Sequence, residues 1–167
     1  MIGHLNLARG FRGGERQTQL LVEGLAKWRL SQRLVARARQ PLVSRLRAVP
    51  ELDLRETSSS LLSAALACRG LSVAHVHDGR SVHAAALARR LFGVPYVITR
   101  RVDNPIRQSL FTRRAYRRAA AVVVLSQAIE REVHRLDPGI ECTRIPDAIS
   151  GWPRHEQNVA ALKAKYR

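Results

Sequence analysis

Short apolar runs alternate with helix-like segments along nearly the whole chain. The runs have the length and composition of β-strands and cover residues 2–7, 34–36, 52–54, 73–77, 95–99, 121–126 and 142–146. The run AVVVLS at 121–126 is typical of a strand buried on both faces of a sheet. Strands and helices that alternate over short connections predict an α/β domain: a mainly parallel sheet of about seven strands with helices on both faces.

Apolar residues at helical spacing mark the segments between these runs. The expected helices cover residues 14–28, 41–48, 61–69, 81–92, 108–120 and 127–136. Two of their ends carry clear local signals. Gly93 follows the helix expected over 81–92, and Ser126 is placed to cap the helix expected over 127–136.

The chain is strongly basic, with 29 Lys and Arg residues against 13 Asp and Glu and a formal net charge of +16 at pH 7. This balance favours an anionic partner, either nucleic acid, an anionic membrane surface or a phosphorylated substrate. A GC-rich genome is an alternative source of the charge, because only Lys27, Lys163 and Lys165 are lysines. Nucleic acid is disfavoured as the partner, since aromatic residues make up only 5% of the chain and the basic residues are spread over many segments.

Composition also excludes several other classes. The apolar fraction of 46% is that of a globular domain, and no run approaches the ~18 apolar residues of a membrane span. The N-terminus lacks the pattern of a secretory signal, so a cytoplasmic protein is expected. Cys68 and Cys142 fit neither a metal pattern nor a disulfide framework, and we expect two reduced, mostly buried thiols. No metal or other cofactor is predicted.

Polar residues follow several of the predicted strands, and the carboxyl ends of parallel strands meet at one edge of a sheet. Gly13 and Gly14, with Arg12 beside them, indicate a diphosphate loop, because glycine permits close backbone approach and a helix N-terminus attracts anions. The alternative is a glycine pair that only turns the chain. The later strand ends carry His75, His77, Asp78 and Arg80, then Arg100, Arg101 and Asp103, then Ser126, then Asp147. Each of these residues alone also has a structural explanation, such as a core histidine for His75.

Five short motifs, taken in their order along the chain, resemble the N-terminal domain of GT-B glycosyltransferases. The resemblance is greatest to the retaining family 4 enzymes that build lipopolysaccharide and other bacterial glycans. The resemblance rests on GGERQ at 13–17, HVHDGRS at 75–81, TRR at 99–101, VVVLSQAIEREV at 122–133 and RIPDAIS at 144–150. It implies a Rossmann-like domain that forms one half of an enzyme. Such an enzyme transfers a sugar from a nucleotide-sugar donor to a glycan or lipid-linked acceptor, normally without a metal.

The resemblance also implies roles for particular residues. Arg12, Gly13 and Gly14 match the loop that approaches the donor diphosphate in that family. Arg101 stands where many members have a catalytically important histidine, and it is the candidate catalytic residue. The acceptor normally binds in this domain, where the candidates are His77, Asp78, Arg80 and Asp103.

Family members have a second Rossmann-like domain that makes most contacts with the nucleotide sugar. Residues 1–150 are therefore expected to form the N-terminal, acceptor-side domain, and residues 151–167 the linker and the start of a C-terminal donor-binding domain. Alone, the chain is expected to be inactive and to self-associate through its uncovered rim. Two alternatives remain open at this point: a basic nucleic-acid-binding module, and a sugar-nucleotide epimerase of the same fold.

The helix expected over 108–120 is rich in arginine. Arg113 and Arg117, and likewise Arg114 and Arg118, stand four residues apart, where like charges cost a few tenths of a kcal/mol. These residues predict peripheral contact with an anionic membrane on its inner face, with Leu110 and Phe111 inserting. The alternative is a solvated face, with Leu110, Phe111 and Ala115 turned to the core.

Overall fold

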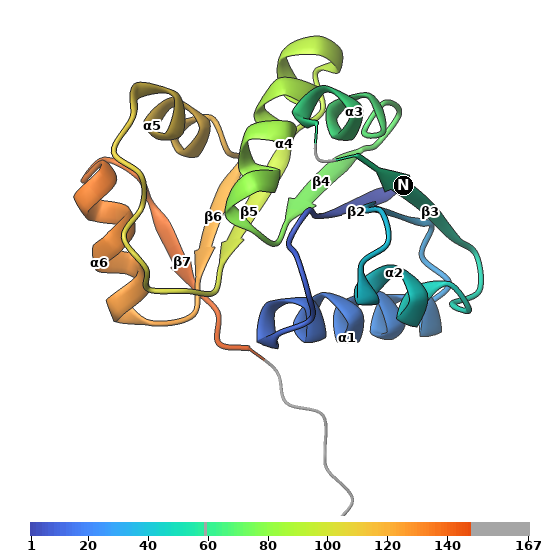
Figure 1. Ribbon diagram of the computed structural model, residues 1–167. Helices are drawn as coiled ribbons and strands as arrows, with labels where there is room; N and C mark the ends of the chain where they lie inside the picture. Colours follow the sequence, from blue (N-terminus) through green and yellow to red (C-terminus); the bar gives the residue numbers. More distant parts are fainter. Residues whose placement is uncertain (59, 148–167) are drawn as a thin grey trace, which may run out of the picture.

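The computed structural model describes residues 1–58 and 60–147 (Figure 1). The linker predicted over 151–167 lies outside the described residues, as do the last three residues of the predicted domain. None of the helices in the described part of the chain combines the length and the apolar character needed to cross a membrane.

Seven strands form one parallel sheet in the order β3-β2-β1-β4-β5-β6-β7, which confirms the predicted fold class. The first strand, β1, lies between β2 and β4. In this register His4 of β1 lies opposite Leu34 of β2 and His75 of β4. The strands are β1 (Ile2–Asn6), β2 (Gln32–Arg37), β3 (Leu52–Thr57), β4 (Val73–Val76), β5 (Tyr96–Arg100), β6 (Ala121–Val124) and β7 (Cys142–Arg144).

Helices cover both faces of the sheet, as predicted (Figure 1). The helices are α1 (Gly13–Lys27), α2 (Pro41–Leu46), α3 (Leu61–Leu66), α4 (Gly79–Phe92), α5 (Leu110–Arg117) and α6 (Gln127–Leu136). On one face, α1 and α2 bury a small core around Val22, Leu34 and Leu46. On the other face, α3, α4, α5 and α6 share the larger core, which includes Leu5, Val76 and Ile98.

Two strands are longer than their apolar runs. The prediction placed them at 34–36 and 52–54, whereas β2 and β3 pair over six residues, from Gln32 opposite Leu52 to Arg37 opposite Thr57. Their ends are polar, and backbone hydrogen bonding to a neighbouring strand extends them where side-chain pattern gives no signal.

Local caps fix the helix ends. Ser126 Oγ accepts a hydrogen bond from the backbone N–H of Ile129 at 3.4 Å, so this serine is the predicted N-cap of α6. Ser109 does the same for α5, which therefore begins at Leu110 rather than at residue 108. Gly93 ends α4 in the left-handed region, with φ of 72°.

Both cysteines are free thiols. Cys68 is fully buried and donates its S–H to the carbonyl oxygen of Ala64 at 3.2 Å, and burial raises its pKa to about 12. Cys142 is half-buried in β7. Neither thiol has the lowered pKa that reactive cysteines need.

Two glycine substitutions are expected to change stability in opposite directions. Gly93→Ala destabilises by about 1–2 kcal/mol, because an alanine at this φ places its Cβ against the backbone. Gly24→Ala, in the interior of α1, stabilises by about 0.5–1 kcal/mol, because its Cβ would meet no atom within 4 Å. Urea unfolding at pH 7 measures both changes. Changes of the same sign would contradict the assignment of these helix positions.

Candidate functional site

A cleft of about 300 Å³ opens at the carboxyl ends of β4 and β5 and beside the first turn of α1, next to the point where the strand order reverses. In open parallel sheets this reversal point is the usual place for ligands, because the helices on its two sides leave toward opposite faces. The first turns of α1 and α4 and the carboxyl end of β5 form its walls. Its lining includes Gly13, Gly14, His77, Asp78, Gly79, Arg101 and Asp147.

Gly13 and Gly14 are the first two residues of α1 and line this cleft. Neither has a positive φ, and a Cβ at either position would meet no atom within 4 Å. The chain itself therefore does not require glycine here. The absence of side chains leaves the first turn of α1, whose N–H groups have no acceptor within the helix, open to the cleft.

Arg12 precedes α1 as an exposed residue. Its backbone N–H donates to Glu15 Oε2 at 2.8 Å, and Glu15 is buried. The Arg12 side chain does not line the cleft, whereas Gly13 and Gly14 do. The structure therefore brings two of the three residues of the predicted diphosphate loop to the cleft.

Asp78 has a structural role in addition to its place in the cleft wall. Its Oδ1 accepts the backbone N–H groups of Arg80 and Ser81 at 2.9 and 3.2 Å, which caps α4 and explains why that helix begins at Gly79 rather than at residue 81. Its Oδ2 accepts the N–H of Leu7 at 2.7 Å and the hydroxyl of Ser81. Asp78 therefore joins the end of β1 to the start of α4.

Arg101 lies just beyond β5 with its side chain only 10% exposed. Its Nε donates to Asp147 Oδ1 at 3.1 Å, and its Nη1 lies 3.1 Å from His77 Nδ1. Asp147, which follows Ile145 and Pro146, thus forms an ion pair with the candidate catalytic residue across 46 positions.

A second cleft, of about 470 Å³, adjoins the first on the α1 side of the sheet. Arg101, Thr99 and Asp147 line both clefts, so Arg101 stands at their junction. Most of the second lining is apolar and comes from α1, β5 and β6; it includes Leu21, Leu25, Trp28, Val97, Val123 and Leu125.

Three histidines lie together beneath these clefts. His4 lies in β1, His75 lies in β4, and His77 directly follows β4. Their ring centroids are 4.2–6.1 Å apart. Burial lowers the pKa of His4 to about 4, although a hydrogen bond to Gln32 opposes the shift. Burial, with a smaller effect from His4 and Arg101, also lowers the pKa of His75 to about 4. The pKa of His77 lies well below its usual value for the same reasons, so all three rings are neutral at pH 7.

Not all predicted residues meet at the cleft. Arg80, in the first turn of α4, and Asp103, beyond β5, are exposed and do not line either cleft.

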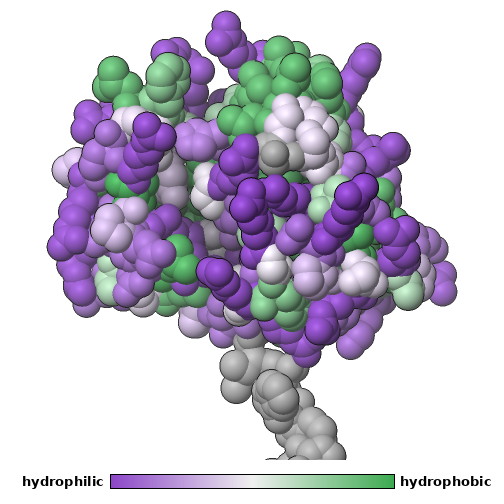
Figure 2. Space-filling view, viewed as in Figure 1, coloured by the Kyte–Doolittle hydropathy of each residue, from purple (hydrophilic) through white to green (hydrophobic). Residues whose placement is uncertain are grey.

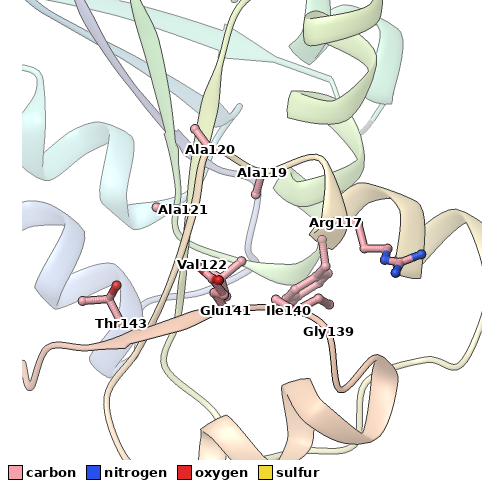
Figure 3. A pocket seen from close by; sticks show the side chains of 10 residues that line it. Arg117, Ala119, Ala120, Ala121, Val122, Gly139, Ile140, Glu141 and Thr143 are labelled. Atoms are coloured by element: carbon pink, nitrogen blue, oxygen red, sulfur yellow. The ribbon is translucent and has the colours of Figure 1, made fainter.

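A third cleft of about 340 Å³ opens at the opposite edge of the sheet, where β6 and β7 begin (Figure 3). Of the predicted site residues, only Arg117 contributes to it, and its side chain extends away from the others (Figure 3).

The four arginines of α5 and its C-cap divide into two pairs. Arg113 and Arg117 lie 3.9 and 3.0 Å from Asp137 Oδ2, and Arg113 Nε also donates to the carbonyl of Leu136. Arg114 and Arg118 form no ion pair with any acidic residue in the described part of the chain.

Leu110 and Phe111 are 81% and 83% exposed. Figure 2 shows apolar spots over α5 within a largely hydrophilic surface. The alternative in which both side chains turn to the core is therefore wrong for them, whereas Ala115 is buried as that alternative expected.

The family model of the glycosyl transferase 4-like domain matches residues 12–147, and the chain belongs to this family. Among curated proteins, no significant match was found. Solved structures share the fold at low identity. HepE from Anabaena in complex with UDP superposes with a TM-score of 0.75 and 12% identity, over 99% of this chain and 49% of HepE. HepE with UDP-glucose gives a TM-score of 0.73 at 14% identity, over 99% and 49% of the two chains.

MurG from Acinetobacter baumannii gives a TM-score of 0.55 at 14% identity, over 74% of this chain and 40% of MurG. The chain thus spans about half the length of HepE. These findings confirm the predicted resemblance to the N-terminal domain of a GT-B glycosyltransferase.

Sequence reasoning missed His4 and Gln32. His4 is a polar residue within the apolar strand pattern IGHLN, and His75 and His77 alternate in the same way along β4. Histidines that alternate toward one face on two strands are a signal of a buried polar cluster. Reading that signal requires the knowledge that β1 and β4 are neighbours, which is a property of the tertiary fold.

The neutral histidines predict acid sensitivity. Because their folded pKa values lie below the unfolded value of about 6.5, the unfolded chain binds more protons, and stability falls as pH decreases from about 6.5 toward 4. Each fully shifted histidine contributes about 1.4 kcal/mol per pH unit in this window. We expect the urea midpoint to decrease from pH 7 to pH 5. In His75→Gln, we expect a smaller decrease of the midpoint per pH unit. Stability that does not change over this range would contradict neutral, buried histidines.

Proposed function

We propose that this chain is the acceptor-side half of a retaining glycosyltransferase that transfers a sugar from a nucleotide-sugar donor to a bacterial glycan or lipid-linked acceptor such as lipopolysaccharide. The observation that carries the proposal is the position of Arg101, held at the junction of two clefts at the strand ends. Membership of the glycosyl transferase 4-like family supports it, and so does the shared fold with HepE, which was solved with UDP and UDP-glucose.

The chemistry of sugar transfer suits these residues. A nucleoside diphosphate leaves, so negative charge develops where preorganised donors can stabilise it. The permanent charge of Arg101 and the open first turn of α1 at Gly13 and Gly14 supply such donors from this half. On the acceptor side, His77 and Asp78 line the same cleft, while Arg80 and Asp103 stand outside it, where a larger acceptor would extend.

In this proposal residues 1–150 form one wall of the active site, and residues 151–167 lead into a second domain that completes the donor site. Loss of that wall removes most donor contacts and leaves the diphosphate in water, where the same charges act more weakly. The chain alone is therefore inactive, and its uncovered rim favours self-association.

The test compares Arg101→Ala with Arg90→Ala in the complete gene product, with UDP-glucose as the first donor and a panel of nucleotide sugars after it. We expect Arg101→Ala to lower kcat per folded molecule about 100-fold, as the loss of one donor to developing charge does. Arg90→Ala, exposed in the last turn of α4 and outside both clefts, leaves kcat unchanged. A large loss in Tm with normal kcat per folded molecule would reject the role of Arg101.

The second arm uses the 167-residue chain alone. Isothermal titration with the same nucleotide sugars is expected to show dissociation constants well above 1 μM, weaker than about −8 kcal/mol. A transfer assay is expected to show no turnover. Tighter binding or measurable turnover would place the whole donor site within this chain and reject the two-domain proposal.

We further propose that the protein is cytoplasmic and contacts the inner face of an anionic membrane through α5. Arg114 and Arg118 carry charge without an acidic partner among the described residues, and Leu110 and Phe111 are exposed beside them. Each arginine near an anionic leaflet contributes about 1 kcal/mol. Burial of each apolar side chain contributes about 1.5–3 kcal/mol.

The membrane proposal predicts salt-sensitive sedimentation with vesicles of anionic phosphatidylglycerol. Joint replacement of Leu110 and Phe111 by Ser is expected to weaken binding at least tenfold, equivalent to about 1.4 kcal/mol. The matched control is joint replacement of Leu62 and Leu66 by Ser, because both are exposed on α3 and stand away from α5. Equal binding to neutral phosphatidylcholine vesicles, or an equal loss in the control, would contradict the proposal.

A further inference from the structure

A chain of hydrogen bonds crosses the sheet beneath the two clefts and ends at Arg101. Gln32 Nε2 donates to the backbone carbonyl of Val22 at 3.2 Å. His4 Nε2 lies 3.1 Å from Gln32 Oε1, and His4 Nδ1 lies 3.3 Å from His77 Nε2. His77 Nδ1 then lies 3.1 Å from Arg101 Nη1. His4, Gln32 and His77 are all at most 5% exposed.

The acceptor at one end of this chain of hydrogen bonds and the donor at its other end determine which ring nitrogens carry protons. The carbonyl of Val22 can only accept, so Gln32 turns its amide nitrogen toward it and its oxygen toward His4. His4 must then carry its proton on Nε2 and leave Nδ1 bare. His77 must donate from Nε2 to that bare nitrogen, which leaves His77 Nδ1 to accept. Arg101, which can only donate, meets that acceptor.

We propose that His4, His77 and Gln32 are positioning residues that form one proton-ordered hydrogen-bond chain, with both rings neutral, and that this chain orients the guanidinium of Arg101 at the junction of the clefts. Asp147 holds Nε of the same guanidinium at 3.1 Å. Because Nε and Nη1 are both hydrogen-bonded, the guanidinium of Arg101 has a single orientation toward a ligand in the clefts. Only the identity of that ligand rests on the proposed glycosyltransferase function.

The same residues raise the alternative of a metal site, because His4, His75 and His77 bring ring nitrogens within 4.8 Å of one another. Arg101 argues against it. A cation bound at His77 Nδ1 would displace Arg101. A cation bound at His77 Nε2 would move the proton to Nδ1, where it would face an N–H of Arg101 at 3.1 Å. In either case a second positive charge would stand beside the guanidinium.

His75 provides a control within the same cluster. Its Nε2 bonds to the hydroxyl of Thr99 at 2.7 Å, and no hydrogen bond joins it to His4 or His77 in the described structure. It is therefore a half-buried histidine whose ring lies against that of His77, at 4.2 Å between centroids, without belonging to the chain of hydrogen bonds. Replacement of His75 should change packing but leave proton positions on the other two rings unaltered.

The test is long-range proton–nitrogen NMR of the 167-residue chain with labelled histidine and arginine at pH 7. We expect His4 and His77 both to carry the proton on Nε2, with bare Nδ1, and the same pattern in His75→Gln. We also expect separate Nη signals for Arg101, because its rotation is restricted. A proton on His77 Nδ1, or averaged Arg101 signals, in the unmodified chain would overturn the proposal without any variant.

Two substitutions at His4 test the positioning of Arg101. His4→Leu removes the acceptor for His77 Nε2, so we expect His77 to populate both neutral forms and the Arg101 Nη signals to average. His4→Asn places a carbonyl oxygen where Nδ1 stood, so we expect both signatures to return. If His4→Leu leaves the Arg101 signals separate, or His4→Asn fails to restore them, the positioning role is rejected.

A titration with Zn²⁺ on the same sample separates the metal alternative. We expect one equivalent of Zn²⁺ to leave the histidine signals unchanged, and stoichiometric binding by His4 and His77 would overturn the proposal. None of these measurements uses a nucleotide sugar. The hydrogen-bond chain and the proposed glycosyltransferase function can therefore fail independently.

Discussion

The parallel pairing of β1 with both β2 and β4 is the constraint on which the candidate site depends. From this central strand the chain builds outward in two directions, so α1 and α4 leave toward opposite faces of the sheet. Their first turns then stand on either side of one cleft. The same pairing sets His4 beside His75 and within hydrogen-bond distance of His77, which brings the three histidines together.

A buried polar cluster at this point has a cost that only complete hydrogen bonding offsets. His4, Gln32 and His77 meet that condition through a single arrangement of protons. The consequence at the surface is a cation of fixed orientation, Arg101, whose charge does not change with pH. The histidines beneath it stay neutral because burial lowers their pKa values, so they support the cation without adding to its charge.

The ion pairs of the acidic residues determine which arginines remain without an opposite charge. Asp137 forms ion pairs with both Arg113 and Arg117. Asp53 pairs with Arg33 and Arg55, which hold the pKa of that carboxyl below its usual value against the opposing effect of burial. Because Lys and Arg outnumber Asp and Glu by 29 to 13, some arginines of the described residues, such as Arg114 and Arg118, have no acidic partner even though these acids pair twice. On α5 this surplus lies beside exposed Leu110 and Phe111, since the short helix buries only Thr112, Ala115 and Tyr116.

The sequence by itself determined the fold class, the approximate position of every strand and helix, and caps such as Ser126 and Gly93. These features depend on periodic burial and on hydrogen bonds between residues close in sequence. It also placed Gly13, Gly14, His77, Asp78 and Arg101 at one edge, because parallel strands end together. Only the tertiary structure decided that Asp78 accepts the N–H of Leu7, that Arg101 pairs with Asp147, and that His4 and Gln32 support Arg101. Those contacts join residues 28 to 73 positions apart, and strand order, which no local pattern encodes, brings them within reach.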